Sequence, residues 1–236
     1  MLKDTVFYNK ESGVYSLKRY PSTSTEFSHF LFKDRLRLTL RLLTPLVAKV
    51  DGATLLEIGC ADGVVISAIY KTFPSLRVLV GEDVSPKMIE VARNNHRADH
   101  INFRLRDDSL NQTKKYDFII EIGVMNYTDI NKDLLNIKNK LSASGYAILS
   151  IVGKDSISNR LKPGEKGFAN LMPYAQYRDL IKDKFEIIDM VSVGLFVPHL
   201  WKVPVLARLV QPVIDFLFRR VWPDLFHEQL YLVRNR

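Results

Sequence analysis

The chain has 236 residues, enough for one large α/β domain with a buried core and few for two. Its apolar fraction of 47% and charged fraction of 25% exclude a disordered or fibrous protein, and its one cysteine, Cys60, excludes an intrachain disulfide and a two-cysteine metal clip. The net charge of +8 favours anionic partners, namely a phosphorylated substrate, nucleic acid or an anionic membrane surface, without choosing among them.

No secretory signal is visible at the start, and no stretch approaches the roughly 18 uninterrupted apolar residues of a membrane-spanning helix. Together with the single cysteine, this predicts a cytoplasmic protein.

The first 50 residues predict an N-terminal helical region. Residues 1–24 are polar and aromatic, and from Glu26 to Val50 apolar residues recur at helical spacing, with a break near Pro45. We expect this helix to lead into the main domain, residues 51–236.

Strand and helix patterns then alternate, which implies βαβ units and a parallel sheet covered on both faces. The expected strands are 54–58, 77–81, 101–105, 116–122 and 146–152, and the expected helices are 64–73, 85–95 and 131–141. A polar loop at 154–170, a helix at 174–184, a strand at 185–193, an apolar helical insertion at 195–222 and a last strand at 229–234 follow.

A glycine-containing turn follows the first strand, and ligands of such sheets bind at the carboxyl ends of strands where the strand order reverses. A dinucleotide fingerprint would place glycines at 59, 61 and 64, but these positions hold Gly59, Ala61 and Val64. The pattern acidic-x-Gly-x-Gly-x-Gly is met at Glu57, Gly59 and Gly63, with Ala61 as a mild departure. Glycine suits this turn because the backbone must pass close to a ligand.

This turn resembles that of the class I S-adenosylmethionine-dependent methyltransferases, and the resemblance extends over residues 50–192. It implies a three-layer Rossmann-like α/β fold with a mostly parallel seven-stranded sheet and an antiparallel last strand. It also implies S-adenosylmethionine as the cofactor, no metal ion, and an N-terminal region, residues 1–50, that caps the cofactor site.

The stretch from Val78 to Arg93 resembles the second motif of the family, in which an acidic residue accepts both ribose hydroxyls. The resemblance assigns this role to Asp83, with Glu82 as the alternative, and places Val84 against the adenine. A carboxylate suits the task because its two oxygens can accept two hydrogen bonds from a cis-diol.

Two further motifs resemble those of the family. Asp107, or its neighbour Asp108, would accept from the adenine amino group, and Glu121 and Ile122 would lie beside the methionine end of the cofactor. Each motif has a simpler interpretation in isolation: the glycine turn could serve packing alone, and Asp107-Asp108 could be an exposed turn. Cys60 is interpreted as a small buried residue rather than a nucleophile.

Methyl transfer is an in-line displacement, so the main task of the protein is to align donor and acceptor. A general base is needed only for a hydroxyl or a protonated amine. The candidates outside the motifs are Tyr15, Tyr20, His29 and His199, and the sequence assigns the role to none of them.

The acceptor is narrowed by exclusion. The stretch after the fourth strand lacks the proline-containing motif of the family's amino-methylating nucleic-acid enzymes. The family's C5-pyrimidine enzymes need a nucleophilic cysteine outside the cofactor turn, and the chain has no cysteine besides Cys60. No basic stripe interleaved with aromatic residues, as expected of a nucleic-acid-binding surface, stands out. A small-molecule, lipid or lipid-linked glycan acceptor is therefore expected, with an RNA methyltransferase as the alternative. An NAD-linked oxidoreductase and a non-catalytic cofactor-binding protein are less favoured.

The insertion at 195–222 is the most unusual segment. On a helix its polar residues Arg208, Gln211, Asp215 and Arg219 gather into a stripe of about 80°, which leaves a broad apolar face. That face could be a lid over an apolar substrate, a homodimer surface, a contact with the inner face of a membrane or a helix buried within the fold.

Overall fold

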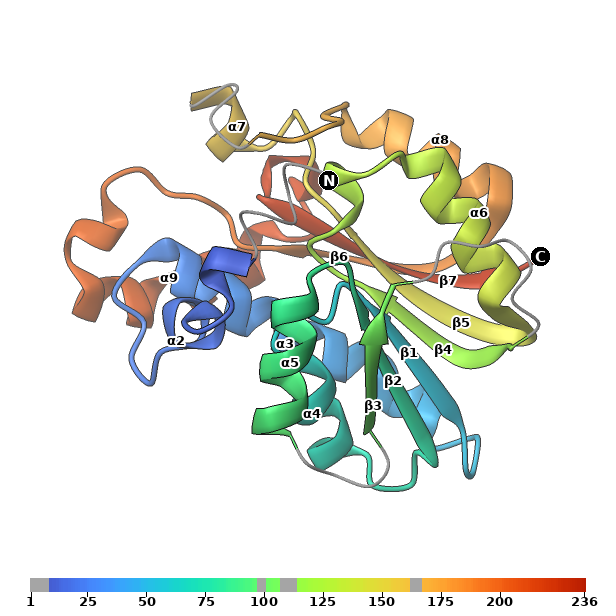
Figure 1. The fold of residues 1–236 in the computed structure, drawn as a ribbon. Helices are drawn as coiled ribbons and strands as arrows, with labels where there is room; N and C mark the ends of the chain where they lie inside the picture. The colour runs from blue at the N-terminus through green and yellow to red at the C-terminus, as the bar shows by residue number, and fades with distance from the viewer. Residues whose placement is uncertain (1–8, 97–100, 107–113, 162–166) are drawn as a thin grey trace.

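The computed structural model describes residues 9–96, 101–106, 114–161 and 167–236. Its strands form one sheet in the order β3-β2-β1-β4-β5-β7-β6 (Figure 1). Strands β1 to β5 pair in parallel, and β7 runs antiparallel to both β5 and β6. The Rossmann-like fold with an antiparallel last strand is confirmed. The strands are β1 Thr54–Ile58, β2 Val78–Asp83, β3 Ile101–Leu105, β4 Tyr116–Glu121, β5 Leu141–Ile151, β6 Phe185–Val193 and β7 Glu228–Asn235.

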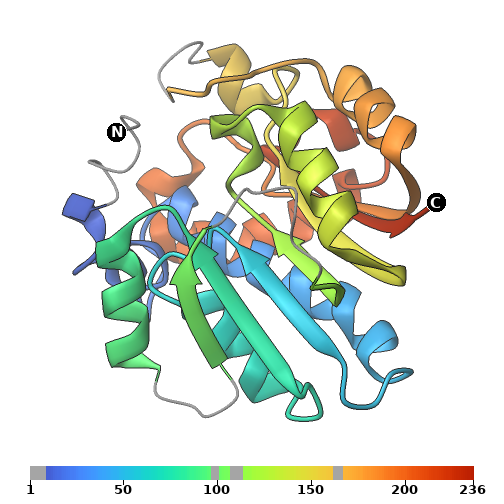
Figure 2. The ribbon, with the colours of Figure 1, turned by 45° about the vertical axis from the view of Figure 1, so that its right-hand side comes forward.

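Helices cover both faces of the sheet (Figures 1 and 2). Successive strand residues point to opposite faces, so Leu55 packs on one side and Leu56 on the other, and both are fully buried. The first face carries α3 Phe27–Val47, α4 Val64–Thr72 and α5 Pro86–Asn95, and the second carries α6 Ile130–Lys140 and α8 Tyr174–Lys184. The shorter elements and the insertion helix are α2 Tyr15–Arg19, η1 Met125–Tyr127, α7 Ile157–Leu161, η2 Leu200–Lys202, α9 Pro204–Phe218 and η3 Pro223–Leu225.

The strand order reverses between β1 and β4. The chain leaves β1 toward α4 on one face and leaves β4 toward α6 on the other. This divergence opens a crevice beyond the carboxyl ends of the two strands, which is the usual ligand position in an open α/β sheet.

Three local features differ from the sequence expectations. Helix α3 runs through Pro45, because only two helical residues follow the proline and few hydrogen bonds are at stake. The short helix α7 lies within the expected polar loop. The insertion is helical only in part, since α9 begins at Pro204, a residue favoured in the first turn of a helix.

Within the described ranges, no helix combines the length and apolar character needed to cross a membrane.

Candidate functional site

The turn after β1 is held in backbone conformations that glycine favours. Gly59 has a φ of 77° and Gly63 a φ of 84°, and a Cβ atom on Gly59 would lie 2.2 Å from Val124 Cγ2. Ala61 has a φ of 48°, which costs an L-residue about 1–2 kcal/mol. Because of the close approach of Val124, any side chain at position 59 would push the turn away from the loop that follows β4.

Asp83 ends β2 and binds this turn. Its Oδ2 accepts a hydrogen bond from Ala61 N at 2.9 Å, and its Oδ1 accepts one from Ser85 N at 2.9 Å. Burial raises the pKa of the Asp83 carboxyl, and the backbone donors oppose that rise. Each carboxylate oxygen can accept a further hydrogen bond, so the group is suited to a ligand with two hydroxyls. The neighbouring Val84 is partly exposed.

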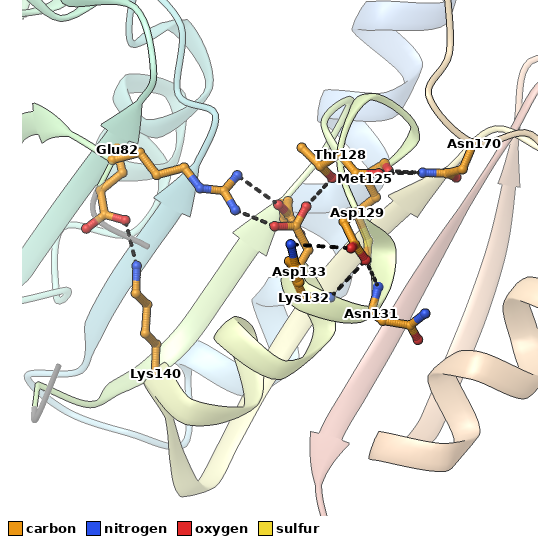
Figure 3. Close-up of polar contacts among 11 residues, drawn as sticks. Glu82, Met125, Thr128, Asp129, Asn131, Lys132, Asp133, Lys140 and Asn170 are labelled. Carbon is orange, nitrogen blue, oxygen red and sulfur yellow. Dashed lines mark hydrogen bonds and ion pairs between the residues drawn. The ribbon is translucent and has the colours of Figure 1, made fainter. Parts of the chain in front are cut away.

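Glu82 occupies a different environment. Its fully buried carboxylate accepts hydrogen bonds from Arg104 Nε at 2.9 Å and from Lys140 Nζ at 3.0 Å. Figure 3 shows the contact with Lys140, which comes from the end of α6. The side chain of Glu82 is thus committed to an internal ion-pair cluster, and this arrangement favours Asp83 as the ligand-facing carboxylate.

Glu57 lies behind the turn, where burial raises the pKa of its carboxyl to about 8. It accepts a hydrogen bond from Ile66 N in the first turn of α4, and its Oε2 has no hydrogen-bond partner among the described residues. Glu57 is therefore placed to anchor the start of α4 from inside. The Cys60 thiol is also buried, and burial raises its pKa, as expected of a packed residue.

The β4 side of the crevice carries a second charged cluster. Arg106 NH1 lies 3.7 Å from Oε1 of the fully buried Glu121, and the same guanidinium pairs with Asp133 of α6. The hydroxyl of Thr128 donates to Asp133, as Figure 3 shows. No local sequence pattern links Arg106 to Asp133, so sequence reasoning missed this cluster.

These elements surround a cavity of about 790 Å³ at the carboxyl ends of β1, β2 and β4. Its lining includes Gly59, Ala61, Asp83 and Val84, four of the residues expected at the cofactor site. Glu57 and Glu121 are buried beneath the surface, and Gly63 caps α4. Asp107 and Asp108 lie outside the described residues. Lining residues that the sequence analysis did not name as site residues are Arg106, Gly123, Val124, Tyr127, Thr128, Asp129, Lys132, Asp133, Leu135, Asn136 and Ala169.

The N-terminal segment lies against both turns of the cavity. Ser16 N donates to Asp62 Oδ2 at 3.0 Å, and Ser85 Oγ donates to Asn9 Oδ1 at 2.6 Å. Tyr15 of α2 lines the cavity. These contacts connect the first helical region to the ends of β1 and β2.

The four candidate bases are dispersed. Tyr15 lines the cavity, with the Arg19 guanidinium 3.8 Å from its ring centroid. Tyr20 is packed against the core, and burial raises its pKa. His29 is within hydrogen-bond distance of Thr25, and His199 lies in the loop before η2. Of these four, Tyr15 alone is in the cavity lining that the structure describes.

The comparisons with known proteins agree with this geometry. Residues 56–147, which run from β1 into β5, match the family described as "Methyltransferase domain". Over this segment the chain is similar to methyltransferase domains, in agreement with the resemblance to the class I S-adenosylmethionine-dependent methyltransferases that the sequence indicates. The matched segment contains the glycine turn, Asp83 and the β4 loop.

A curated relative of the chain is the malonyl-acyl-carrier-protein O-methyltransferase of Bacillus cereus. The two are 23% identical over 159 residues, which cover 66% of this chain and 56% of that protein. The chain spans about half the length of the curated relatives it matches.

Solved structures cover more of the chain. The 4+2 cyclase SpnF aligns with a TM-score of 0.70 and 15% identity, over 99% of this chain and 96% of its own. The magnesium protoporphyrin IX methyltransferase of Synechocystis PCC 6803, solved with bound S-adenosylhomocysteine, aligns with a TM-score of 0.64 and 16% identity, over 98% of each chain. At these identities the likeness shows a shared fold.

Proposed function

We propose that the protein binds S-adenosylmethionine and transfers its methyl group to a small-molecule, lipid or lipid-linked glycan acceptor. The observation that carries the proposal is the convergence of Gly59, Ala61, Asp83 and Val84 on one cavity at the strand-order reversal.

The residues of the cavity fit this cofactor. The Asp83 carboxylate can accept from both ribose hydroxyls, and Val84 offers an apolar contact for the adenine beside it. The backbone at Gly59, which carries no side chain, allows the amino-acid end to approach the turn. A volume of about 790 Å³ is within the range that takes small ligands. When bound, the sulfonium supplies an electrophilic methyl group.

The chain's own residues would bind and align the two reactants. Asp83 holds the ribose, and Tyr15 from the N-terminal segment excludes water above the cavity. Glu57 and Glu121 act from beneath by fixing α4 and Arg106. These residues would hold the acceptor in line with the methyl group that the bound cofactor would supply.

The acceptor class rests on two observations. The Bacillus cereus relative is named for O-methylation of a malonyl group on acyl-carrier protein, and an ionised carboxylate accepts a methyl group without a general base. The cavity also includes the apolar side chains of Ile122, Val124 and Leu135, which suit an acceptor with a hydrocarbon part. We place the protein in the cytoplasm, with a peripheral contact at a membrane surface.

The test is calorimetry of the full chain with S-adenosylmethionine, S-adenosylhomocysteine and NAD. We expect both adenosyl compounds to bind, and Asp83→Ala to weaken binding about ten- to a hundredfold, because hydrogen bonds to a charged acceptor contribute roughly 1.5–3 kcal/mol. Asp179→Ala, at an exposed position on α8, is the control and should bind normally. Binding of NAD without either adenosyl compound would contradict the proposal.

The acceptor is then sought with labelled S-adenosylmethionine in a cell lysate separated into lipid, glycan, protein and RNA. Label in the lipid or glycan fraction, or in small molecules, supports the proposed class. Label in RNA alone would establish the alternative that the net charge of +8 keeps open. Cofactor binding without any transfer would point to a non-methylating use of the fold.

A further inference from the structure

Helix α9 buries polar side chains and exposes apolar ones, the reverse of an ordinary surface helix. Its buried residues are Ala207, Gln211 and Asp215, whereas Leu209 is 71% exposed and Phe216 is 78% exposed. The exposed apolar side chains of this segment, here called the α9 face, are Val203, Val205, Leu206, Leu209, Val213, Phe216, Leu217, Val221 and Trp222. A contiguous apolar surface of this kind marks an interaction site.

The orientation of α9 is fixed by hydrogen bonds on its inner side. Gln211 Nε2 donates to Leu195 O at 2.7 Å and to Asp215 Oδ1 at 2.8 Å, and Leu195 N donates to the same Asp215 oxygen at 3.1 Å. Arg219 NH2 lies 3.1 Å from Asp34 Oδ2 on α3. Rotating the helix to bury its apolar side would break these contacts, so they keep the α9 face turned outward.

Exposed basic residues border the α9 face. Lys202 precedes α9, Arg208 lies on it, and Arg220 follows it. Residues 196–222 contain one acidic residue, Asp215, and it is buried. The face thus combines apolar area with positive charge along its border, the pattern of a helix that lies in a lipid interface.

The charge at the border of the α9 face and the length of α9 indicate which partner fits the face. A second copy would bring two basic borders together without exposed acidic residues on the face to neutralise them. A span is excluded for α9 because 15 residues measure about 22 Å, less than the roughly 30 Å of a hydrocarbon core. Anionic lipid headgroups would pair with the basic residues at the border of the α9 face, and the apolar side chains would be buried at the boundary with the acyl chains. Trp222 suits the depth between headgroups and acyl chains, because its ring is apolar and its N–H is polar.

We propose that the α9 face docks on an anionic membrane surface, with the helix lying in the plane of the interface. Docking itself does not depend on the proposed function. If that function holds, docking places the methyltransferase next to a lipid or lipid-linked acceptor. In Figure 1, α9 lies on the left side of the molecule beside α3.

The test is flotation of the full chain with liposomes of phosphatidylcholine alone and of phosphatidylcholine with phosphatidylglycerol. We expect binding to the anionic liposomes that weakens as salt is added. The double variant Leu209→Asp with Phe216→Asp should reduce binding at least about tenfold. Lys202→Gln with Arg220→Gln should reduce it about 25-fold, from roughly fivefold for each of the two positive charges removed. The matched control is Leu161→Asp on α7, also an exposed leucine on a helix, which should bind like the wild type.

Calorimetry with S-adenosylhomocysteine is run on every variant, and unchanged affinity shows that the variants are folded. This measurement reports on the proposed function separately, since flotation needs no activity. A protein that ignores anionic liposomes, or that binds neutral and anionic liposomes equally, overturns the proposal. So does a concentration-dependent dimer in sedimentation that the Leu209→Asp, Phe216→Asp variant dissociates, because the α9 face would then be a subunit interface.

Discussion

Helices α6 and α9 are both amphipathic, yet they face the protein with opposite sides. Helix α6 buries Leu134 and Ile137 against the sheet and leaves Lys132 exposed, whereas α9 buries Gln211 and Asp215. Periodicity in the sequence identifies two faces of a helix but carries no information about which face meets the protein. That choice is made by the partners, which are apolar strands under α6 and the charged side of α3 with the loop at Leu195 under α9.

The sharpest test of this comparison replaces one leucine on each helix. Leu134→Ala on α6 should lower the free energy of unfolding by about 2–5 kcal/mol, because it leaves a cavity in a fully buried site. Leu209→Ala on α9 should change it by less than about 0.5 kcal/mol, because that side chain is exposed. Urea denaturation measures both values. Equal losses would mean that the α9 face is buried in solution, and the comparison would fail.

The buried carboxyl of α9 should produce a distinct pH dependence. Burial raises the pKa of Asp215 to about 6, above the 3.8 expected in the unfolded chain. The folded protein therefore binds the proton more tightly, and this group stabilises the fold below about pH 4 and loses that contribution as the pH rises through 6. Relative to Asp215→Asn, the wild type should gain up to about 3 kcal/mol between pH 7.5 and pH 4.

Denaturation of both proteins across this pH range checks the prediction, with Asp179→Asn on α8 as an exposed control. A constant difference between the wild type and Asp215→Asn would show that Asp215 titrates normally, and α9 would then be less tightly docked on α3 than the structure has it.

The smallest effects concern how the two helices begin. The side chain of Asp129 accepts hydrogen bonds from Asn131 N and Lys132 N at the start of α6, whereas Val203 precedes α9 without a side-chain cap among the described residues. Asp129→Ala should cost about 1 kcal/mol of stability, and Val203→Ser should add roughly 0.5–1 kcal/mol. Thermal denaturation gives both signs, and a loss for Val203→Ser would indicate that the valine is engaged by a neighbour.

Much of the fold follows from local patterns. The predicted helix 174–184 and strand 185–193 coincide with α8 and β6, because their apolar periods change from helical to strand-like at Phe185. The members of the α9 polar stripe were also predictable, since helical spacing alone places Gln211 and Asp215 together.

The site could be predicted less completely. The glycine turn and the acidic end of β2 have local signals, but Glu82 and Asp83 are adjacent and their environments differ only through Arg104 and Lys140. Arg106 and Asp133 are 27 positions apart and meet because both side chains lie at the cavity, one after β3 and one on α6. Such contacts depend on tertiary geometry, so no window of sequence contains them.

The antiparallel pairing of β6 and β7 has a consequence for the insertion between them. Val193 lies opposite Glu228, and His227 N donates to Gly194 O at 2.9 Å, so the two ends of the insertion meet at one point of the sheet. The segment is thus a closed excursion from a hairpin, and its length adds little to the entropy of closing the loop. The pairing of β6 with β7 is set by the strands themselves, so the insertion between them can differ in length without a shift in the register of any strand.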